Sequence, residues 1–588
     1  MRLEDLGMIG NCQIAALVSR TGDIVWCCLP KFDSEPVFSA LLDHERGGRF
    51  AVAPAGGSPG TQRYLPNTNV LETTFTEPEG SFRVVDFAPR FLQHDRSFRP
   101  TQIVRIVEPL AGAPRVRVLC EPRLGWSRGV PSLVQGSNHV NFEGFSGMLR
   151  LTTDIPLSYL GGPAFGLSER RYLVLSWGEP VEQPLPALCE RFLGETVRYW
   201  QRWVKHCNVP PLFQDEVIRS GLALKLHFFE DTGAIVAATT TSIPEAPGSG
   251  RTWDYRYCWL RDSAYVLGAF RLLGHFEERE RFVHYLLDLA ARNPSLDLAP
   301  VYRIDGTTDL EERILEDWPG FEGETPVRIG NAAAAYRQHD IFGEMVLALA
   351  PVMLDQRFRA DQTPETLDLL ERLARKAISV AGSPDAGIWE HRSDLRPRTF
   401  SSLMCWAAAD RMARVAAIHV SGREAEYRAA ARRIHEEIQA RTWNADVGAF
   451  AAAYDGRDLD ASLLQMVPLH FLPPGDAQLR ASVDAIWKGL ARDGWLFRYH
   501  NDDGLGAPAV AFILCTFWLV EALAATGRGD EARVVFDRAR SALSPLGLLA
   551  EDYQTSNLRM WGNFPQAYSH VGLIHAAFAA SPRWADIL

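Results

Sequence analysis

The chain has 588 residues, of which 47% are hydrophobic and 23% charged, with a formal net charge of −11. This length exceeds what one hydrophobic core supports, so more than one domain is expected. The acidic balance disfavours nucleic acid and anionic membranes as partners, because both bind basic surfaces. The net charge does not argue against a neutral ligand.

The N-terminus lacks the basic and apolar regions of a signal peptide, and no segment has the roughly 18 apolar residues of a membrane span. Nine cysteines are scattered along the chain without a CxxC pair. Cysteines in this pattern indicate reduced thiols and no zinc site. We therefore expect a cytoplasmic protein.

Residues 1 to about 185 are predicted to be β structure. Short segments rich in β-branched residues, such as Phe82–Phe87, Arg115–Val118 and Tyr172–Leu175, alternate with Gly/Pro turns. The segment from Gly7 to Ser34 fits two strands and a turn. Many short strands separated by such turns predict an antiparallel sandwich.

Helical periodicity takes over after a connecting amphipathic stretch at 188–203 and the Pro210–Pro211 pair. Apolar residues then recur at i, i+3, i+4 and i+7. Ten or more helices with long, chemistry-rich loops at every second junction predict a toroid of helical hairpins. A TPR-like array is the structural alternative, although no 34-residue repeat is visible. The predicted helices span 217–229, 263–273, 282–291, 332–349, 363–381, 401–419, 425–441, 510–525, 530–543 and 568–580.

The stretch Trp253–Asp262 combines aromatic rings with two arginines and two aspartates. Planar rings offer stacking platforms, and an arginine beside an aspartate offers donors and a charged acceptor for hydroxyl groups. That mixture suits a sugar better than a phosphate or a hydride acceptor. The alternative is structural, with the rings in the core and the charges in a local ion pair.

Two glutamates stand out by context. Glu390 follows a tryptophan in an apolar loop, where the charged form of a carboxyl is disfavoured, as a general acid requires. Glu551 follows an apolar run and precedes a loop rich in Asn, Gln, Tyr and His. Taken singly, Glu390 could be a solvated partner of Arg392, and Glu551 a helix N-terminal acid. Together they form the pair that glycoside hydrolysis needs: one acid for the leaving oxygen and one base for water.

The helical half carries a series of short motifs: Tyr255–Ser263, Pro326–Asn331, Ile388–Glu390, Leu496–Tyr499, Leu549–Glu551 and Gly562–His570. In this order they resemble glycoside hydrolase family 15, the family of glucoamylases and bacterial trehalases. The segments Asp5–Cys12 and Leu29–Ser34 look like the N-terminal domain of its trehalase-like branch. The resemblance implies an N-terminal antiparallel β-sandwich over residues 1–185, a helical linker over residues 186–211 and a catalytic (α/α)6 barrel over residues 212–588.

By this resemblance, Glu390 is the general acid and Glu551 the general base. The same resemblance implies that Arg261 and Asp262 bind the non-reducing glucose, and that Tyr255 helps to hold the nucleophilic water. The remaining residues expected to contact substrate are Tyr257, Trp259, Arg328, Trp389, His391, Arg392 and Arg498, the last of which contacts the sugar on either side of the scissile bond.

His391 departs from the pattern of fungal glucoamylases, which carry a second carboxylate directly after the general acid, in contact with the leaving sugar. The leaving-group subsite should therefore differ, and specificity for long α-1,4-glucans is in doubt. The chain also ends at Leu588, soon after the last predicted helix, without a starch-binding domain. Both points favour a small disaccharide.

The sequence thus predicts an inverting, exo-acting α-glucosidase that releases β-glucose, with α,α-trehalose as the first choice of substrate. A glucoamylase or an isomaltose-type glucohydrolase is the second choice. A disaccharide phosphorylase would use phosphate in place of the second carboxylate, and a silent sugar-binding protein would lose one carboxylate. We expect a neutral di- or oligosaccharide of glucose as partner, no cofactor and no metal, since His391 and His570 lack partners at ligand spacing. Homo-oligomerisation is left open.

Overall fold

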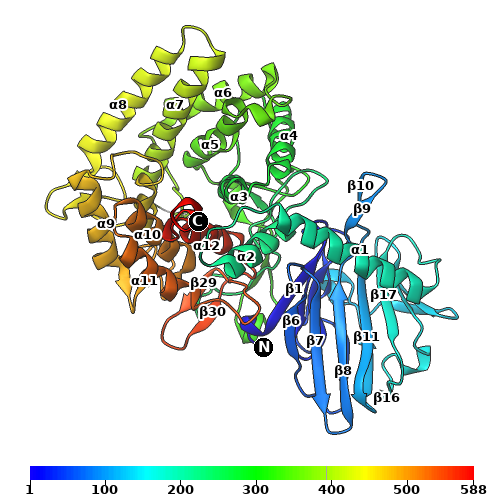
Figure 1. Cartoon of the computed structure of the whole chain (residues 1–588). Coiled ribbons are helices and arrows are strands. Elements are labelled where there is room, and N and C mark those ends of the chain that lie inside the picture. The colour runs from blue at the N-terminus through cyan, green and yellow to red at the C-terminus, as the bar shows by residue number, and fades with distance from the viewer. Residues whose placement is uncertain (392–393) are drawn as a thin grey trace.

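The computed structural model describes residues 1–391 and 394–588, and it shows a β-sandwich beside a larger helical domain (Figure 1). The first sheet has the order β1-β2-β3-β5-β12-β16, with β4 on β3, and the second has the order β13-β14-β15-β17-β11-β8-β7-β6. The neighbours in both sheets pair antiparallel, which confirms the expected sandwich. The bounds of the first sheet are β1 Leu6–Gly10, β2 Ala15–Ser19, β3 Asp23–Cys28, β4 Pro36–Phe38, β5 Phe50–Pro54, β12 Arg115–Cys120 and β16 Phe165–Gly166. Those of the second are β6 Thr61–Tyr64, β7 Leu71–Glu77, β8 Gly80–Phe87, β11 Gln102–Gly112, β13 Ser132–Gln135, β14 His139–Glu143, β15 Leu149–Thr153 and β17 Arg171–Trp177.

The central strands β11 and β17 of the second sheet are buried on both faces. Along β17, Leu173 and Leu175 point into the core between the sheets, whereas Tyr172 and Val174 pack with Phe192 of helix α1 (Leu185–Lys205). Successive side chains of a strand point to opposite faces, so this alternation follows from the pleat. Helix α1 therefore lies across the sandwich on its way to the barrel (Figure 1).

The N-terminal segment contains three strands where the sequence predicted two. The side-chain oxygen of Asn11 accepts hydrogen bonds from the backbone N–H groups of Gln13 and Ile14, at 3.3 and 3.2 Å. This local turn separates β1 from β2. The pattern around Asn11 was not recognised as a turn, so the two strands were merged.

The helical domain is a double ring of helices. In the inner ring each element contacts the next, and the last contacts the first, which closes the ring. Its members are α3 (Leu260–Leu273), α5 (Asp340–Leu354), α7 (Thr399–His419), the short 3₁₀ helix η7 (Ala461–Met466), α10 (Ile513–Ala525) and α12 (Ala567–Ala580). The outer ring consists of α2 (Gln214–His227), α4 (Glu277–Arg292), α6 (Pro364–Val380), α8 (Glu424–Thr442), α9 (Ala477–Leu490) and α11 (Gly529–Arg540). This is the (α/α)6 barrel that the sequence predicted.

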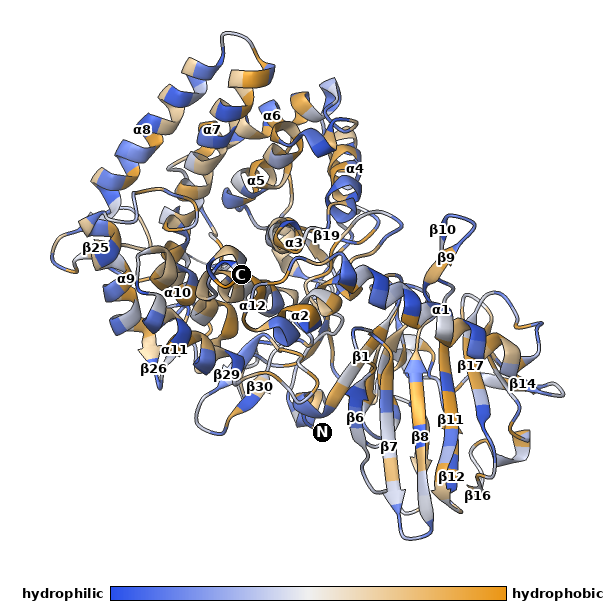
Figure 2. Cartoon of the chain, viewed as in Figure 1, coloured by the Kyte–Doolittle hydropathy of each residue, from blue (hydrophilic) through white to orange (hydrophobic). Residues whose placement is uncertain are grey.

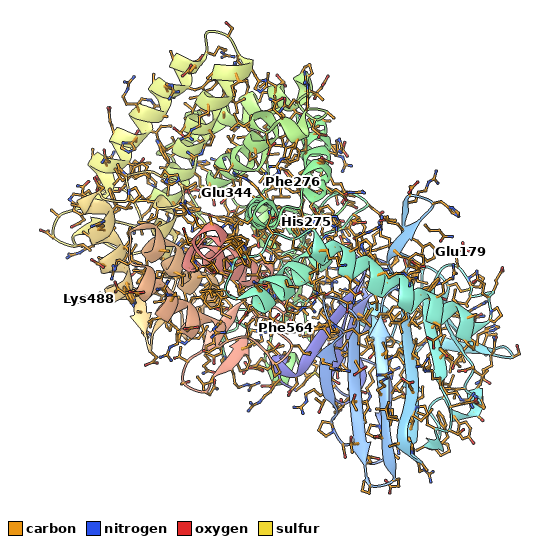
Figure 3. All side chains as sticks on the ribbon, in the orientation of Figure 1. Glu179, His275, Phe276, Glu344, Lys488 and Phe564 are labelled. Atoms are coloured by element: carbon orange, nitrogen blue, oxygen red, sulfur yellow. The ribbon has the colours of Figure 1, made fainter. Side chains whose placement is uncertain are left out.

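Burial separates the two rings. Helix α7 is buried over most of its length, whereas α8 buries only a stripe of residues and shows a largely hydrophilic surface in Figure 2. Inner helices also carry polar groups into the ring. Glu344 of α5, labelled in Figure 3, is one of these, and burial raises its pKa well above the ordinary value. The inner helices thus bury apolar side chains against neighbouring helices, and they also bury some polar side chains such as that of Glu344.

Two helices differ from the prediction. The helix expected over 332–349 begins only at Asp340, because Ala332–Ala335 form a 3₁₀ helix capped by the side chain of Asn331. Alanine periodicity alone does not separate these two states. Helix α9 was missed, although Asp476 caps it by accepting from two backbone N–H groups.

The sandwich supports the loop that leads into α3. Trp26 donates a hydrogen bond to the carbonyl of Thr239 at 2.7 Å, and Arg256 donates one to the carbonyl of Ser34 at 2.7 Å. Arg256 also forms an ion pair with Asp254 at 2.7 Å. The segment before α3 is therefore held from the N-terminal domain. Within 1–391 and 394–588, no helix combines the length and apolarity needed to cross a membrane.

Candidate active site

A cavity lies where the inner-ring elements begin. Loops entering α3, α5, α7, α10 and α12 supply most of its wall, so the N-terminal ends of inner helices converge on it. The lining residues are Ala237, Glu245, Arg251, Trp253, Tyr255, Trp259, Arg261, Asp262, Asn331, Tyr336, Ile388, Trp389, Glu390, His391, Arg498, Asp503, Leu505, Phe512, Glu551, Gln566 and Tyr568.

One side of the cavity, here called the Arg261 side, is built on the first turn of α3 and comprises Tyr255, Trp259, Arg261 and Asp262. Arg261 donates a hydrogen bond to Gln338 at 3.1 Å and lies 3.8 Å from Asp340. Burial raises the pKa of Asp262 to about 7, and Arg261 opposes that shift. This side therefore presents a fixed guanidinium beside a buried carboxyl.

Glu390 is held in place by the Arg261 side. Its Oε1 atom accepts hydrogen bonds from Trp259 Nε1 at 2.9 Å and from Arg261 at 3.3 Å. Its backbone has φ of 59°, a left-handed conformation that is uncommon outside glycine. A non-glycine residue in this conformation marks a position that its surroundings determine, as at many functional sites.

Glu551 is only 2% exposed and directly precedes strand β29 (Asp552–Gln554). Burial and the nearby Glu245 raise the pKa of Glu551 to about 8, while Arg498 and a hydrogen bond from Tyr255 oppose the shift. Gly562 is needed beside it, because a Cβ there would lie 2.6 Å from that of Glu551. The structure thus encloses a carboxyl whose proton affinity is raised by burial and by a neighbouring carboxylate.

A second group of lining residues, here called the Arg498 side, comprises Glu245, Arg251, His391, Arg498 and Asp503. Arg498 lies over Phe512 at 5.2 Å and over Trp389 at 5.8 Å. It donates a hydrogen bond to Glu245 at 2.5 Å. Burial lowers the pKa of His391 to about 4, so its imidazole is neutral at pH 7.

The structure brings together most of the residues that the sequence singled out. Those that line this cavity are Tyr255, Trp259, Arg261, Asp262, Trp389, Glu390, His391, Arg498 and Glu551. Arg392 lies outside the described residues.

Two of the expected substrate contacts are placed elsewhere. Tyr257 lines a second cavity together with Asp33 and Arg303, because the chain bends at residues 256–257 and does not keep the strand alternation that would place Tyr257 beside Tyr255. Arg328 does not line the catalytic cavity. It donates hydrogen bonds to the carbonyls of Gly250 and Thr252 and lies 4.8 Å from the ring of Trp253, a residue that does line it. The expectation that Tyr257 lines the catalytic cavity is therefore corrected. Arg328 supports the cavity wall through the residues that it contacts.

Sequence reasoning missed several lining residues. Gln566 and Tyr568 stand inside a motif that was already noted, so that motif could have revealed them. Glu245, Arg251 and Asp503 carried no such signal. They are charged residues in loops, and only the fold shows that they are turned inward.

A helical double ring whose central pocket holds several carboxyls, Glu390 and Glu551 among them, beside aromatic rings and arginines is typical of a glycoside hydrolase. Comparison with known families agrees, since residues 212–578 match glycosyl hydrolases family 15 and residues 1–153 match the trehalase-like N-terminal domain. The chain belongs to glycoside hydrolase family 15.

Relatives and solved structures extend this result over the whole chain. The chain is 35% identical to a trehalase of Mycobacterium tuberculosis, over 98% of this chain and 89% of the relative. It is 32% identical to a trehalase of Thermoplasma volcanium, over 98% and 93%. A bacterial glucoamylase complexed with acarbose shares the fold with a TM-score of 0.66 at 14% identity, over 98% of this chain and 94% of that one.

Proposed function

We propose that the enzyme hydrolyses α,α-trehalose to two molecules of glucose. The observation that carries the proposal is the meeting of Glu390 and Glu551 in one cavity, in a chain whose full-length relatives include trehalases. The Arg261 side would bind the non-reducing glucose through its hydroxyl groups. The Arg498 side would receive the leaving glucose.

The proposed reaction is a single displacement with inversion. Glu390 donates its proton to the glycosidic oxygen as the bond from that oxygen to the anomeric carbon breaks. Glu551 takes a proton from a water molecule, whose oxygen bonds to the anomeric carbon from the opposite face. Tyr255, which hydrogen-bonds Glu551, supports that water. The two carboxyls of an inverting pair stand roughly 6.5–9.5 Å apart to leave room for it.

The lining of the Arg498 side supports a single glucose as the leaving sugar. His391 stands where fungal glucoamylases place a carboxylate, and it is neutral at pH 7. Asp503 and Leu505 also line the cavity. A neutral imidazole in place of that carboxylate fits a leaving sugar different from that of a long α-1,4-glucan. A disaccharide phosphorylase is disfavoured by the second carboxyl, Glu551.

A glucose-release assay against trehalose, maltose, isomaltose and soluble starch tests the substrate. We expect the highest kcat/KM on trehalose, and faster release from maltose or starch would favour a glucoamylase instead. Proton NMR of the first turnovers tests inversion. An inverting enzyme releases equal amounts of β- and α-glucose from trehalose, because only the attacked sugar inverts. A product that is α-glucose alone would refute inversion.

We also propose a division of the chain into a supporting domain at 1–185, a linker at 186–211 and a catalytic domain at 212–588. The hydrogen bonds from Trp26 to Thr239 and from Arg256 to Ser34 support this division. The nine cysteines are free and fit a reducing compartment, so we propose a cytoplasmic location. Cell fractionation tests it, and recovery in the culture medium would overturn it.

A further inference from the structure

A chain of ion pairs runs through the Arg498 side of the cavity. Arg498 donates to Glu245 at 2.5 Å, and Arg251 approaches the same carboxylate at 3.7 Å. Arg251 in turn holds Asp503 with two hydrogen bonds of 2.9 and 2.6 Å, and it donates to the Gly506 carbonyl at 2.6 Å. Two cations thus alternate with two carboxylates, and the chain is neutral overall.

Glu245 occupies the centre of this chain. It is only 4% exposed, and its second oxygen accepts a hydrogen bond from Trp253 Nε1 at 3.0 Å. Glu245, in the loop before α3, is therefore joined directly to Arg498 and through Arg251 to Asp503, both of which lie in the loop before α10. A buried charged group is retained at low cost only when it is paired in this way. Neither the acid nor the base of the proposed mechanism needs it for proton transfer.

We propose that Glu245 is a positioning residue for hydrolysis, one that fixes Arg498 across the scissile bond and anchors the Asp503 loop around the leaving sugar. The inference rests on the proposed function and deepens it. It assigns a role to a cavity carboxylate that touches both arginines of the Arg498 side. Without it, Arg498 would lose the acceptor that sets the direction of its guanidinium.

The same carboxylate acts on Glu551 through space. The charged or titratable groups that face Glu551 are Glu245, Arg498, Tyr255, Asp262 and Asp552. Glu245 disfavours a second negative charge nearby, whereas Arg498 favours it. Removing the charge of Glu245 would leave Arg498 to stabilise ionised Glu551 alone. The pKa of Glu551 would then fall, and the base would ionise at lower pH.

Two variants separate these effects. Glu245→Gln removes the charge with little change of shape. Its acid limb of kcat/KM against pH should move down by about one pH unit. Glu245→Asp keeps the charge but is one methylene too short to reach Arg498. Its KM should rise about tenfold, with an acid limb closer to that of the wild type. Glu72→Gln is the matched control, since Glu72 is a buried sandwich carboxylate paired with Arg63 and Arg83.

Each variant is assayed on the α-glucoside that the wild type hydrolyses fastest, with thermal unfolding measured in parallel. A wild type that prefers another sugar overturns the proposed substrate, while the Glu245 variants on that sugar still test the inference. A changed pH profile in Glu245→Gln, absent from Glu72→Gln, supports it. Variants that only melt earlier, with the wild-type profile and KM, would show a merely structural Glu245 and overturn the inference.

Discussion

The two sides of the cavity are built in different ways. The Arg261 side is part of a helix N-terminus, and Arg261 and Asp262 sit in the first turn of α3. The Arg498 side comes from loops, and a chain of ion pairs through Glu245 and Asp503 fixes it. A site on regular elements is held more rigidly than one on loops. The first side therefore suits an invariant glucose, and the second suits a leaving group that varies.

This difference predicts two kinds of variant. Changes on the Arg261 side should lower hydrolysis of every α-glucoside by the same factor, since each presents the same terminal glucose. Changes on the Arg498 side should alter the ranking of substrates. In the proposed mechanism Glu390 and Glu551 act on the scissile bond itself, so their loss should affect all substrates and exceed both kinds of change.

The largest expected effect is that of Glu551→Gln. An amide cannot take a proton from water, and loss of a general base typically lowers kcat by about 10²–10⁴-fold. Folding should be retained, because the substitution is isosteric. Steady-state kinetics with circular dichroism checks both points. Activity near that of the wild type would reject Glu551 as the base.

The next effect is that of Asp262→Asn. A hydrogen bond to a charged group contributes about 1.5–3 kcal/mol, which corresponds to a loss of roughly ten- to 150-fold in kcat/KM. We expect the same factor on trehalose and on any second substrate, measured side by side. A factor that differs by an order of magnitude between two sugars would place Asp262 on the leaving-group side.

Asp503→Asn should act selectively. Arg251 would keep an acceptor but lose the charged partner that holds the loop. We expect KM for trehalose to rise about tenfold, which corresponds to about 1.4 kcal/mol, with kcat little changed. The ratio of kcat/KM between trehalose and maltose is the measurement. An unchanged ratio would contradict the assignment of the Asp503 loop to the leaving sugar.

The same contrast explains what the sequence could and could not predict. Arg261 and Glu390 stand in short contiguous motifs, and the resemblance of these motifs to those of glycoside hydrolase family 15 placed them at the cavity. The division into a β half and a helical half follows from periodicities of two and 3.6 residues, which depend on neighbours in the chain. These features could be predicted because each is written in a contiguous stretch of sequence.

Glu245 and Asp503 could not be predicted, because their partners lie far along the chain. The bond from Arg498 to Glu245 spans 253 residues, and that from Arg251 to Asp503 spans 252. No local pattern marks a loop carboxylate that pairs at such a distance. The helix start expected at Ala332 failed for a different reason, since Asn331 caps a short 3₁₀ helix there and alanine periodicity does not separate it from an α-helix.

The smallest effect should be that of Tyr257→Phe, which tests the correction made by the fold. Tyr257 faces the second cavity, and its hydroxyl hydrogen-bonds Asp254, a residue that supports the segment before α3. Losing that bond should lower the free energy of unfolding by about 0.5–1.5 kcal/mol. Because the ring does not line the catalytic cavity, kcat/KM should stay within about twofold of the wild type. Chemical denaturation and a trehalose assay measure the two quantities. A loss of activity larger than the loss of stability explains would return Tyr257 to the substrate and show that the glucose contacts extend beyond the Arg261 side.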